Sequence, residues 1–183
     1  MTKALIVIDV QESFRQRPNW AEISDPDIAD KVGVLVDAAR AAGDRVIWVL
    51  HAEPGSDTVF DPANGHVRLI EGLKPEDGEP TLYKTSHNAF TTTNLGQLLT
   101  TANLHELVIC GIRTEQCCET TARVGSDLGY DVTFVIDATA TQPITHPVTG
   151  RTLGVDEIKE RTEFALAGRF ATIATVAELT GLS

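Results

Sequence analysis

A short, almost unbroken apolar run near the amino terminus constrains the fold more than any other feature. Residues 4–10 read Ala-Leu-Ile-Val-Ile-Asp-Val, and Asp9 is the one polar residue among them. A strand that is buried on both faces shows such a run, whereas a half-exposed strand alternates between apolar and polar residues. We therefore expect a central strand of a parallel sheet, with Asp9 at its carboxyl end. A carboxylate there either caps a turn or is paired or used chemically, because burying an unpaired charge is costly.

Further segments alternate between strand and helix patterns along the chain. The predicted strands are residues 45–50, 81–85, 107–110, 131–136 and 171–174. The predicted helices are residues 27–42, 94–102, 114–128 and 155–168, followed by a closing helical turn at 176–179. This alternation predicts an α/β fold with three layers, α/β/α, around a central, mostly parallel sheet. A length of 183 residues suits one domain, over residues 1–183.

Three connecting segments show no regular pattern. Residues 15–27 form a polar loop, residues 53–78 contain scattered Pro and Gly, and residues 139–154 contain two prolines. A loop as long as residues 53–78 in a compact domain is usually functional, so we expect it to wall a pocket. On the helix predicted at 155–168, the residues expected to face the core are Ile158, Phe164, Ala165 and Leu166.

The balance of charge narrows the class of partner. The formal net charge of −11 argues against nucleic acid and against an anionic membrane, because both are polyanions. The first apolar run is too short for a signal peptide or a membrane span. We therefore expect a cytoplasmic protein that acts on a small molecule. Cys110, Cys117 and Cys118 are then expected to be reduced, without a disulfide framework.

Cys117 occupies the place along the chain where a reactive thiol is expected. It follows a predicted strand and falls in the first turn of the predicted helix, with Thr114 as N-cap and Glu115 suited to the helix start. Unpaired N–H groups and the helix dipole favour a thiolate there, and the same N–H groups can hold an oxyanion. The alternative is that Cys117 and Cys118 are small buried hydrophobic residues, which is the commonest role of a free cysteine.

Several side chains that could take part in catalysis fall at the same end of the predicted strands. Asp9, His51, Lys84 and the turn from Gly111 to Cys117 all lie at carboxyl ends of strands, where ligands bind in sheets of this kind. In this hypothesis the Cys117 thiolate attacks a carbonyl carbon, Asp9 takes the thiol proton, and Lys84 holds both by charge. The alternative for Lys84 is a solvated position at a strand end.

Motifs for several other chemistries are missing. No glycine-rich phosphate loop follows a strand, and no Gly-x-Ser-x-Gly elbow is present. Cysteine and histidine spacings typical of zinc sites are also missing. His51, His66 and His87 could still gather around a metal in space, but loop histidines are more often solvated or hydrogen-bonded. We therefore expect no cofactor and no metal.

Three motifs, taken together, resemble those of the isochorismatase-like cysteine hydrolase family. They are Val-Ile-Asp-Val-Gln-x-x-Phe around Asp9, Lys84 shortly before Asn-Ala-Phe, and Gly-Ile-Arg-Thr-Glu-Gln-Cys-Cys-Glu-Thr-Thr-Ala around Cys117. They occur in the family's order and span residues 4 to about 141. The resemblance implies the family's Rossmann-like fold and a catalytic triad of Asp9, Lys84 and Cys117. Because the family's nucleophile follows Gly-x-x-Thr-[Asp/Glu]-x, it selects Cys117 over Cys118.

The resemblance also implies details of the site. The Ile112–Arg113 peptide should be cis, and the N–H groups of Arg113 and Cys117 should form the oxyanion hole. An arginine at position 113 departs from the small or aliphatic residue usual in the family. It either reaches a substrate carboxylate or forms a salt bridge with Glu115 or Glu119. A second departure concerns metal binding. Nicotinamidases of the family hold a metal ion through an Asp and two His, and His51 is the one matching residue in this sequence.

The function implied is hydrolysis of a C–N bond in a small amide, ureido or carbamoyl compound through a thioester. Three alternatives stay open. They are hydrolysis of a vinyl ether, as in isochorismatase proper, a non-catalytic redox or sensor role for Cys117 and Cys118, and a metal-dependent amidase with a metal at His51. Members of the family commonly form homo-oligomers, so the resemblance implies a dimer or tetramer, with residues 139–154 as a candidate contact between subunits. The residues expected to line the substrate pocket are Gln11, Phe14, Trp20, Phe60, Phe90 and Arg113, with Gln142 as a further candidate.

Overall fold

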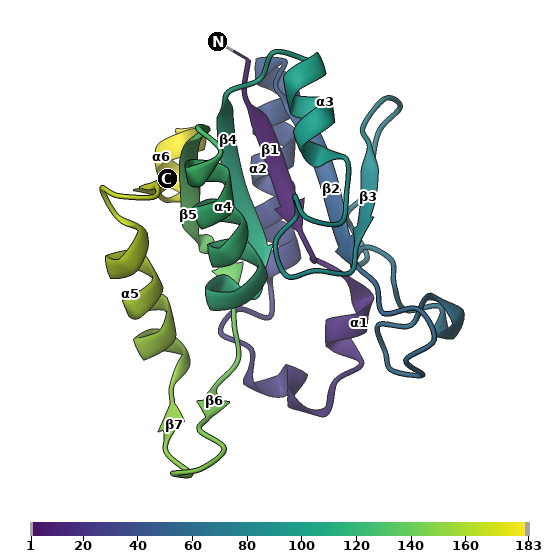
Figure 1. Cartoon of the computed structure of the whole chain (residues 1–183), viewed down its shortest axis with the longest axis vertical. Coiled ribbons are helices and arrows are strands. Elements are labelled where there is room, and N and C mark those ends of the chain that lie inside the picture. Colours follow the sequence, from purple (N-terminus) through teal and green to yellow (C-terminus); the bar gives the residue numbers. More distant parts are fainter. Residues whose placement is uncertain (1, 182–183) are drawn as a thin grey trace.

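The computed structural model describes residues 2–181, and a six-stranded parallel sheet forms the centre of this range (Figure 1). The strands lie in the order β3-β2-β1-β4-β5-β8. Their bounds are β1 Ala4–Ile8, β2 Arg45–His51, β3 Thr81–Lys84, β4 Glu106–Ile112, β5 Asp131–Ala140 and β8 Thr172–Ala174. The predicted α/β fold is confirmed. The first apolar run forms β1, which pairs with β2 on one side and with β4 on the other.

Helices cover both faces of the sheet. On one face lie α2 (Ile28–Ala42) and α6 (Val176–Thr180), and on the other lie α3 (Leu95–Thr101), α4 (Glu119–Asp127) and α5 (Val155–Leu166). Alternate residues of β1 point to opposite layers, because Leu5 packs in the α2 cluster and Ile6 in the α3/α4 cluster. This double burial explains why β1 is apolar throughout.

β4 and β5 continue past their predicted ends by more than one residue. β4 extends through Gly111 to Ile112, and β5 extends to Ala140. The register between them shifts after Ile109 and resumes with Gly111 opposite Thr139. A bulge of this kind interrupts the regular apolar pattern of a strand. The strands predicted from that pattern therefore end near the register shift.

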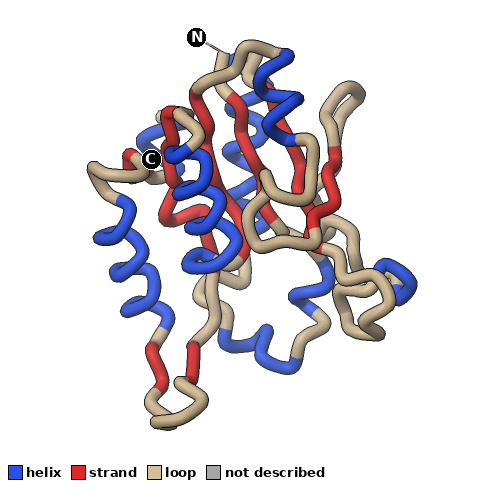
Figure 2. The backbone as a smooth tube through the Cα atoms, viewed as in Figure 1, coloured by secondary structure: helices blue, strands red, loops and turns tan. Residues whose placement is uncertain are grey.

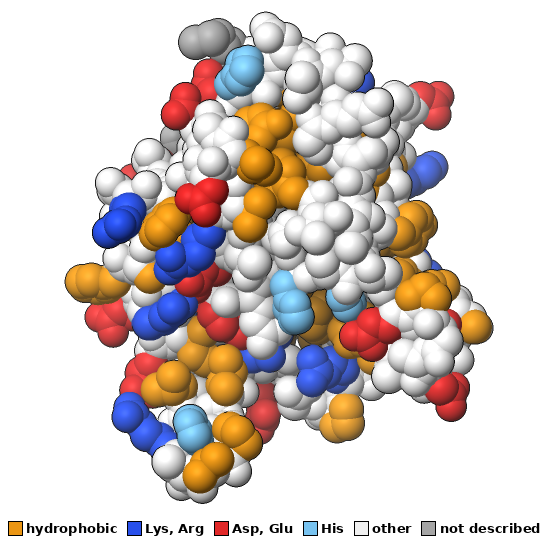
Figure 3. Space-filling view, in the orientation of Figure 1, with side chains coloured by type: hydrophobic (Ala, Val, Ile, Leu, Met, Phe, Trp, Pro, Cys, Tyr) orange, Lys and Arg blue, Asp and Glu red, His pale blue; other side chains and the backbone are white. Residues whose placement is uncertain are grey.

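The predicted loops contain short regular elements. Residues 15–27 include the 3₁₀ helix η1 (Pro18–Glu22), which follows the short helix α1 (Glu12–Arg15). Residues 139–154 include an antiparallel hairpin of β6 (Ile144–Thr145) and β7 (Thr152–Leu153). The long segment 53–78 has one 3₁₀ turn, η2 (Pro62–Asn64). Hydrophobic side chains reach the surface at the protruding hairpin, where Val148 is 86% exposed (Figure 3).

The prediction that Phe164 faces the core is wrong. Phe164 is 79% exposed, although Ile158 and Leu166 of the same helix are buried as expected, and Ala165 is half-buried. The buried stripe of α5 consists of Ile158, Thr162 and Leu166, which are four residues apart. Phe164 lies two residues from Thr162, about 200° around the helix, and therefore faces solvent.

The parallel direction of the strands brings their carboxyl ends together at one end of the sheet. Long loops gather there (Figure 2), including those that contain η1 and η2. Ligands of open α/β sheets bind at such an end. Within residues 2–181, no helix has the length and apolar character needed to cross a bilayer.

Candidate active site

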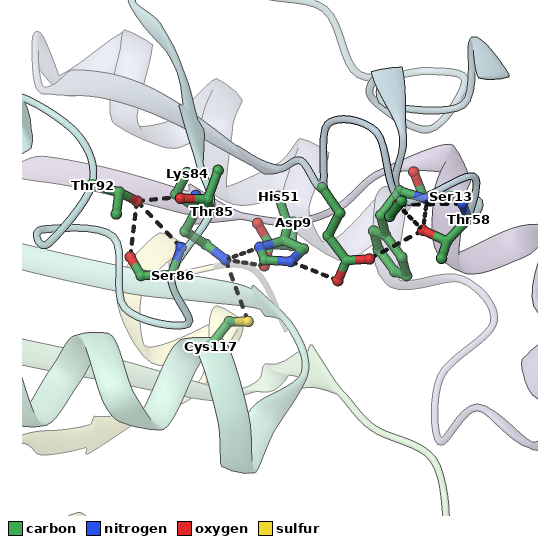
Figure 4. Close-up of polar contacts among 12 residues, drawn as sticks. Asp9, Ser13, His51, Thr58, Lys84, Thr85, Ser86, Thr92 and Cys117 are labelled. Carbon is green, nitrogen blue, oxygen red and sulfur yellow. Dashed lines mark hydrogen bonds and ion pairs between the residues drawn. The ribbon is translucent and has the colours of Figure 1, made fainter. Parts of the chain in front are cut away.

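Asp9, Lys84 and Cys117 come together at the carboxyl end of the sheet (Figure 4). Lys84 Nζ lies 2.8 Å from Asp9 Oδ2 and donates to Cys117 Sγ at 3.4 Å. Asp9 and Lys84 are fully buried, and Cys117 is 7% exposed. We refer to these three residues as the Asp9–Lys84–Cys117 cluster. The convergence expected from the sequence, of side chains that follow three different strands, is therefore found.

The backbone around Gly111 allows β4 to approach β1 closely beside Asp9. Gly111 pairs with Ile8 across the two strands and has a φ of +131°. A Cβ at this position would lie 1.9 Å from the carbonyl oxygen of Ile8. Only glycine is compatible with both the angle and the distance. Asp9 itself has a φ of +54°, in the left-handed region that non-glycine residues seldom adopt.

A π-helical turn carries the thiol, in place of the regular helix start that was predicted. The turn, η3, spans Thr114–Cys118 and leads directly into α4. Thr114 was predicted as the N-cap, but Arg113 occupies that position, and the Thr114 hydroxyl donates to Thr139 Oγ1 at 2.9 Å. The Ile112–Arg113 peptide is cis, as the resemblance implied. π-turns within helices are frequent at functional sites.

Burial around Cys117 favours the neutral thiol, whereas the predicted helix start favoured a thiolate. Burial raises the pKa of Cys117 to about 12, and the Asp9 carboxylate adds to this effect, while Lys84 opposes it. Burial also raises the pKa of Asp9, against the attraction of Lys84. For Lys84, burial alone would lower the pKa, but the charges of Asp9 and Cys117 outweigh it and the pKa is raised. Burial thus favours a neutral thiol beside the buried salt bridge of Asp9 and Lys84.

His51 extends the cluster towards the surface. Its Nδ1 lies 3.3 Å from Lys84 Nζ, and its Nε2 lies 3.2 Å from Oε1 of Glu53. His51 was expected at this end of the sheet, but its partner Glu53 was not. The sequence signal for this contact was an acidic residue two positions after the histidine. It was missed because Glu53 falls in a segment predicted to be an irregular loop.

Arg113 forms a salt bridge with Glu115, one of the partners expected for this side chain. Its Nη2 lies 3.1 Å from Glu115 Oε1 and donates to the carbonyl oxygen of Gln142 at 2.9 Å. Thr141 Oγ1 donates to Glu115 Oε2 at 2.6 Å. Glu119 instead binds Arg123 and Arg161. The guanidinium charge of Arg113 is therefore balanced by its own neighbour.

The backbone N–H of Arg113 is free for another role. Among residues 2–181 it donates to no acceptor, although the Arg113 carbonyl accepts from the N–H groups of Gln116 and Cys118. This is the N–H that the resemblance assigns to an oxyanion hole. An unpaired N–H at a buried position is uncommon, because burying one without a partner is costly.

The residues expected to line a substrate pocket are only partly brought together. Phe14 and Phe60 pack edge to face at 5.1 Å, and Phe60 packs in the same way on His51 at 5.6 Å. Trp20 is half-buried against the α2 side of the core. Phe90 stacks on Tyr130 at 5.7 Å. The ring of Phe90 also lies against Gly125, about two turns along from Cys117, so Phe90 is not brought to the cluster.

Two polar candidates for the pocket are engaged in holding the backbone. Gln11 Oε1 accepts from the N–H of His51 at 2.7 Å, and Gln11 Nε2 donates to the His51 carbonyl at 3.0 Å. The amide of Gln11 thus clamps the end of β2 beside the cluster. Gln142 Nε2 donates to the carbonyl of Asn19 at 2.8 Å. Its Oε1 is buried and has no hydrogen-bond partner among the described residues.

The other two cysteines lie in packed surroundings. Cys118 and Cys110 are fully buried on opposite faces of the sheet. Burial raises the pKa of Cys110 to about 12 and raises that of Cys118 well above its ordinary value. Within residues 2–181, no group of three His, Cys, Asp or Glu side chains is arranged to hold a metal ion.

Comparisons with known proteins agree with this fold. The isochorismatase domain model matches residues 3–177. Streptothricin hydrolase of Streptomyces noursei is 35% identical over 144 residues, which cover 78% of this chain and 56% of that protein, so the chain spans little more than half of that relative. Ureidoacrylate amidohydrolase RutB of Pantoea ananatis is 28% identical over an alignment of 173 residues, covering 74% of this chain and 68% of that one. The crystal structure of a cysteine hydrolase from Pseudomonas syringae pv. phaseolicola matches with a TM-score of 0.88 and 27% identity, over 98% of this chain and 91% of that chain. The chain belongs to the isochorismatase family of hydrolases.

Proposed function

We propose that the protein is a cysteine hydrolase that cleaves the C–N bond of a small amide, ureido or carbamoyl compound through a thioester on Cys117. The observation that carries the proposal is the contact of Cys117 Sγ with Lys84 Nζ at 3.4 Å, beside a carboxylate 2.8 Å from the same ammonium. A nucleophile, a base and a fixed positive charge are thus within reach of one another. Two relatives, a streptothricin hydrolase and a ureidoacrylate amidohydrolase, support a substrate of this class.

In the first half of the reaction, the thiol attacks the substrate carbonyl. As the C–S bond forms, the thiol proton passes to the Asp9 carboxylate, whose raised pKa suits a proton acceptor. Negative charge then develops on the carbonyl oxygen, and the N–H groups of Arg113 and Cys117 are proposed to hold it. One such donor contributes about 2.7–4 kcal/mol in comparable enzymes. When the C–N bond breaks, Asp9 returns the proton to the leaving nitrogen.

In the second half, water hydrolyses the thioester. Asp9, again a carboxylate, takes a proton from the attacking water, and the C–S bond breaks to release the acid. The proton then returns to sulfur and restores the resting thiol. Lys84 stays protonated throughout, because its raised pKa keeps the ammonium charged, and it stabilises negative charge on sulfur in both halves. The acid and the amine or ammonia are the two products.

The test is a pair of cysteine variants assayed on a panel of small amides, ureides and carbamoyl compounds. Cys117→Ala should lose turnover by at least about a thousandfold, as expected when a covalent nucleophile is removed. The neighbouring variant Cys118→Ala is the matched control and should keep most of the activity. Mass spectrometry of rapidly quenched enzyme should detect an acyl adduct on Cys117. Full turnover by Cys117→Ala would refute the mechanism.

A further inference from the structure

The ammonium of Lys84 has three close polar neighbours. They are Asp9 Oδ2, in a salt bridge at 2.8 Å, and two hydrogen-bond partners, Cys117 Sγ at 3.4 Å and His51 Nδ1 at 3.3 Å. A lysine ammonium offers three donors and no acceptor. Because the side chain is fully buried, these three contacts hold the ammonium in place. Two of them lead to the groups of the proposed reaction, and the third leads to His51.

The contact with Lys84 determines the tautomer of His51. Since Nζ can only donate, Nδ1 of His51 must be unprotonated to accept from it. The ring proton of the neutral histidine is then on Nε2, which faces Glu53 Oε1 at 3.2 Å and donates to it. A carboxylate that accepts from one ring nitrogen makes the other a better acceptor, as in the second shells of metal-bound histidines.

Neighbouring groups hold this pair in place (Figure 4). Thr58 Oγ1 donates to Glu53 Oε2 at 3.1 Å, so both carboxylate oxygens of Glu53 have a partner. The ring of Phe60 packs on His51, and Gln11 holds the His51 backbone. The imidazole therefore has a fixed position, a fixed rotation and a fixed tautomer.

We propose that His51 and Glu53 form a positioning pair, which orients the Lys84 ammonium towards Cys117 and Asp9. This inference rests on the proposed function, because it assigns the pair a role in activating the Cys117 thiol. Without the histidine, one N–H of a buried ammonium has no partner, which is costly. The ammonium then turns to find another acceptor, and less positive charge faces the sulfur as negative charge develops there.

The rate at which iodoacetamide alkylates Cys117, followed by peptide mass spectrometry, tests the proposal. His51→Leu removes the acceptor and should slow alkylation at least fivefold. His51→Asn retains an oxygen at the δ1 position, and the rate should stay within threefold of the unchanged protein. His105→Leu is the matched control, since His105 is exposed before β4, at the opposite end of the sheet. Its rate should not change.

A purely structural effect of His51→Leu has a different signature. A loosened fold would expose Cys110 and Cys118 to the reagent, whereas a change confined to Lys84 leaves both protected. A loss smaller than fivefold in His51→Leu, or no recovery in His51→Asn, would overturn the proposal.

Nitrogen NMR of the unchanged protein gives an independent measurement. We expect His51 to show an unprotonated Nδ1 and a protonated Nε2 at neutral pH, with the signals assigned by their loss in His51→Leu. The opposite tautomer, or a rapidly exchanging ring, would also overturn the proposal. This measurement stands even if Cys117 of the unchanged protein resists alkylation, which would count against the proposed function instead.

Discussion

Lys84 Nζ lies 2.8 Å from Asp9 Oδ2, and neither side chain is exposed to solvent. Such a pair is costly to break from one side, because the remaining charge stays buried without a partner. The stability of the protein and its proposed chemistry therefore depend on the same two side chains.

Removal of the lysine charge tests this dependence. Lys84→Met should lower the free energy of unfolding by about 3–5 kcal/mol, because Asp9 is left as an unpaired buried carboxylate. The double variant Asp9→Asn with Lys84→Met removes both charges and should lose less than the sum of the two single variants. Urea unfolding measures all of them. A loss below about 1 kcal/mol in Lys84→Met would contradict a buried ion pair.

Alkaline pH should destabilise the protein partly through Cys117. The folded pKa of about 12 lies above the ordinary value of 9.0, so the protonated thiol is favoured by folding. This contribution is complete below pH 9.0 and is lost as the pH rises from there towards the folded pKa. Between pH 9 and about pH 10.5, the unchanged protein should lose up to about 1.4 kcal/mol per pH unit more than Cys117→Ala. Urea unfolding at a series of pH values measures this. An equal loss of unfolding free energy per pH unit in the two proteins would show that folding does not raise the pKa of the thiol.

Gly111 should tolerate no side chain. Gly111→Ala places a Cβ 1.9 Å from the Ile8 carbonyl oxygen at a φ of +131°, and backbone atoms must move to relieve the contact. We expect a loss of at least about 3 kcal/mol in unfolding free energy and a displaced Asp9. Gly96→Ala is the control, because Gly96 lies inside α3 with its nearest neighbour 3.9 Å away, and it should be neutral or stabilising. Similar stabilities for the two variants would argue against the close approach of β4 and β1.

Two side chains near the carboxyl end of α5, one exposed and one buried, should respond differently to truncation. Phe164→Ala removes an exposed ring and should change the unfolding free energy by no more than about 0.5 kcal/mol. Leu166→Ala empties a fully buried position and should cost about 2–5 kcal/mol. Thermal or urea unfolding distinguishes them. A large loss in Phe164→Ala alone would point to a contact made by this ring in solution.

The layers of the fold and the three residues of the cluster could be predicted because they rest on local patterns. Continuous apolar runs identify strands buried on both faces, and a parallel sheet brings their carboxyl ends together. Asp9, Lys84 and Cys117 each follow or end such a run, so their meeting follows from topology. The choice of Cys117 over Cys118 needed the family motif, since both cysteines fall in the same turn.

Features that depend on tertiary contacts could not be predicted in the same way. The raised pKa of Cys117 depends on burial and on the nearby Asp9 carboxylate, which no local pattern around the cysteine reveals. The extension of β4 through Gly111 depends on a register shift against β5, which has no local signature. The pairing of Arg113 with Glu115 is supported by hydrogen bonds to Gln142 and Thr141, which lie far along the chain. Phe164 shows that an aromatic residue near a helical stripe need not belong to it.

The order of the strands places Lys84 on an outermost strand, β3, which has a neighbour on one side only and is four residues long. Short edge strands separate from a sheet more readily than central ones, because fewer hydrogen bonds hold them. Fraying of β3 would withdraw the ammonium while β1 and β4 stay paired. On warming, the proposed activity would then be lost through local separation of β3, before the whole protein unfolds.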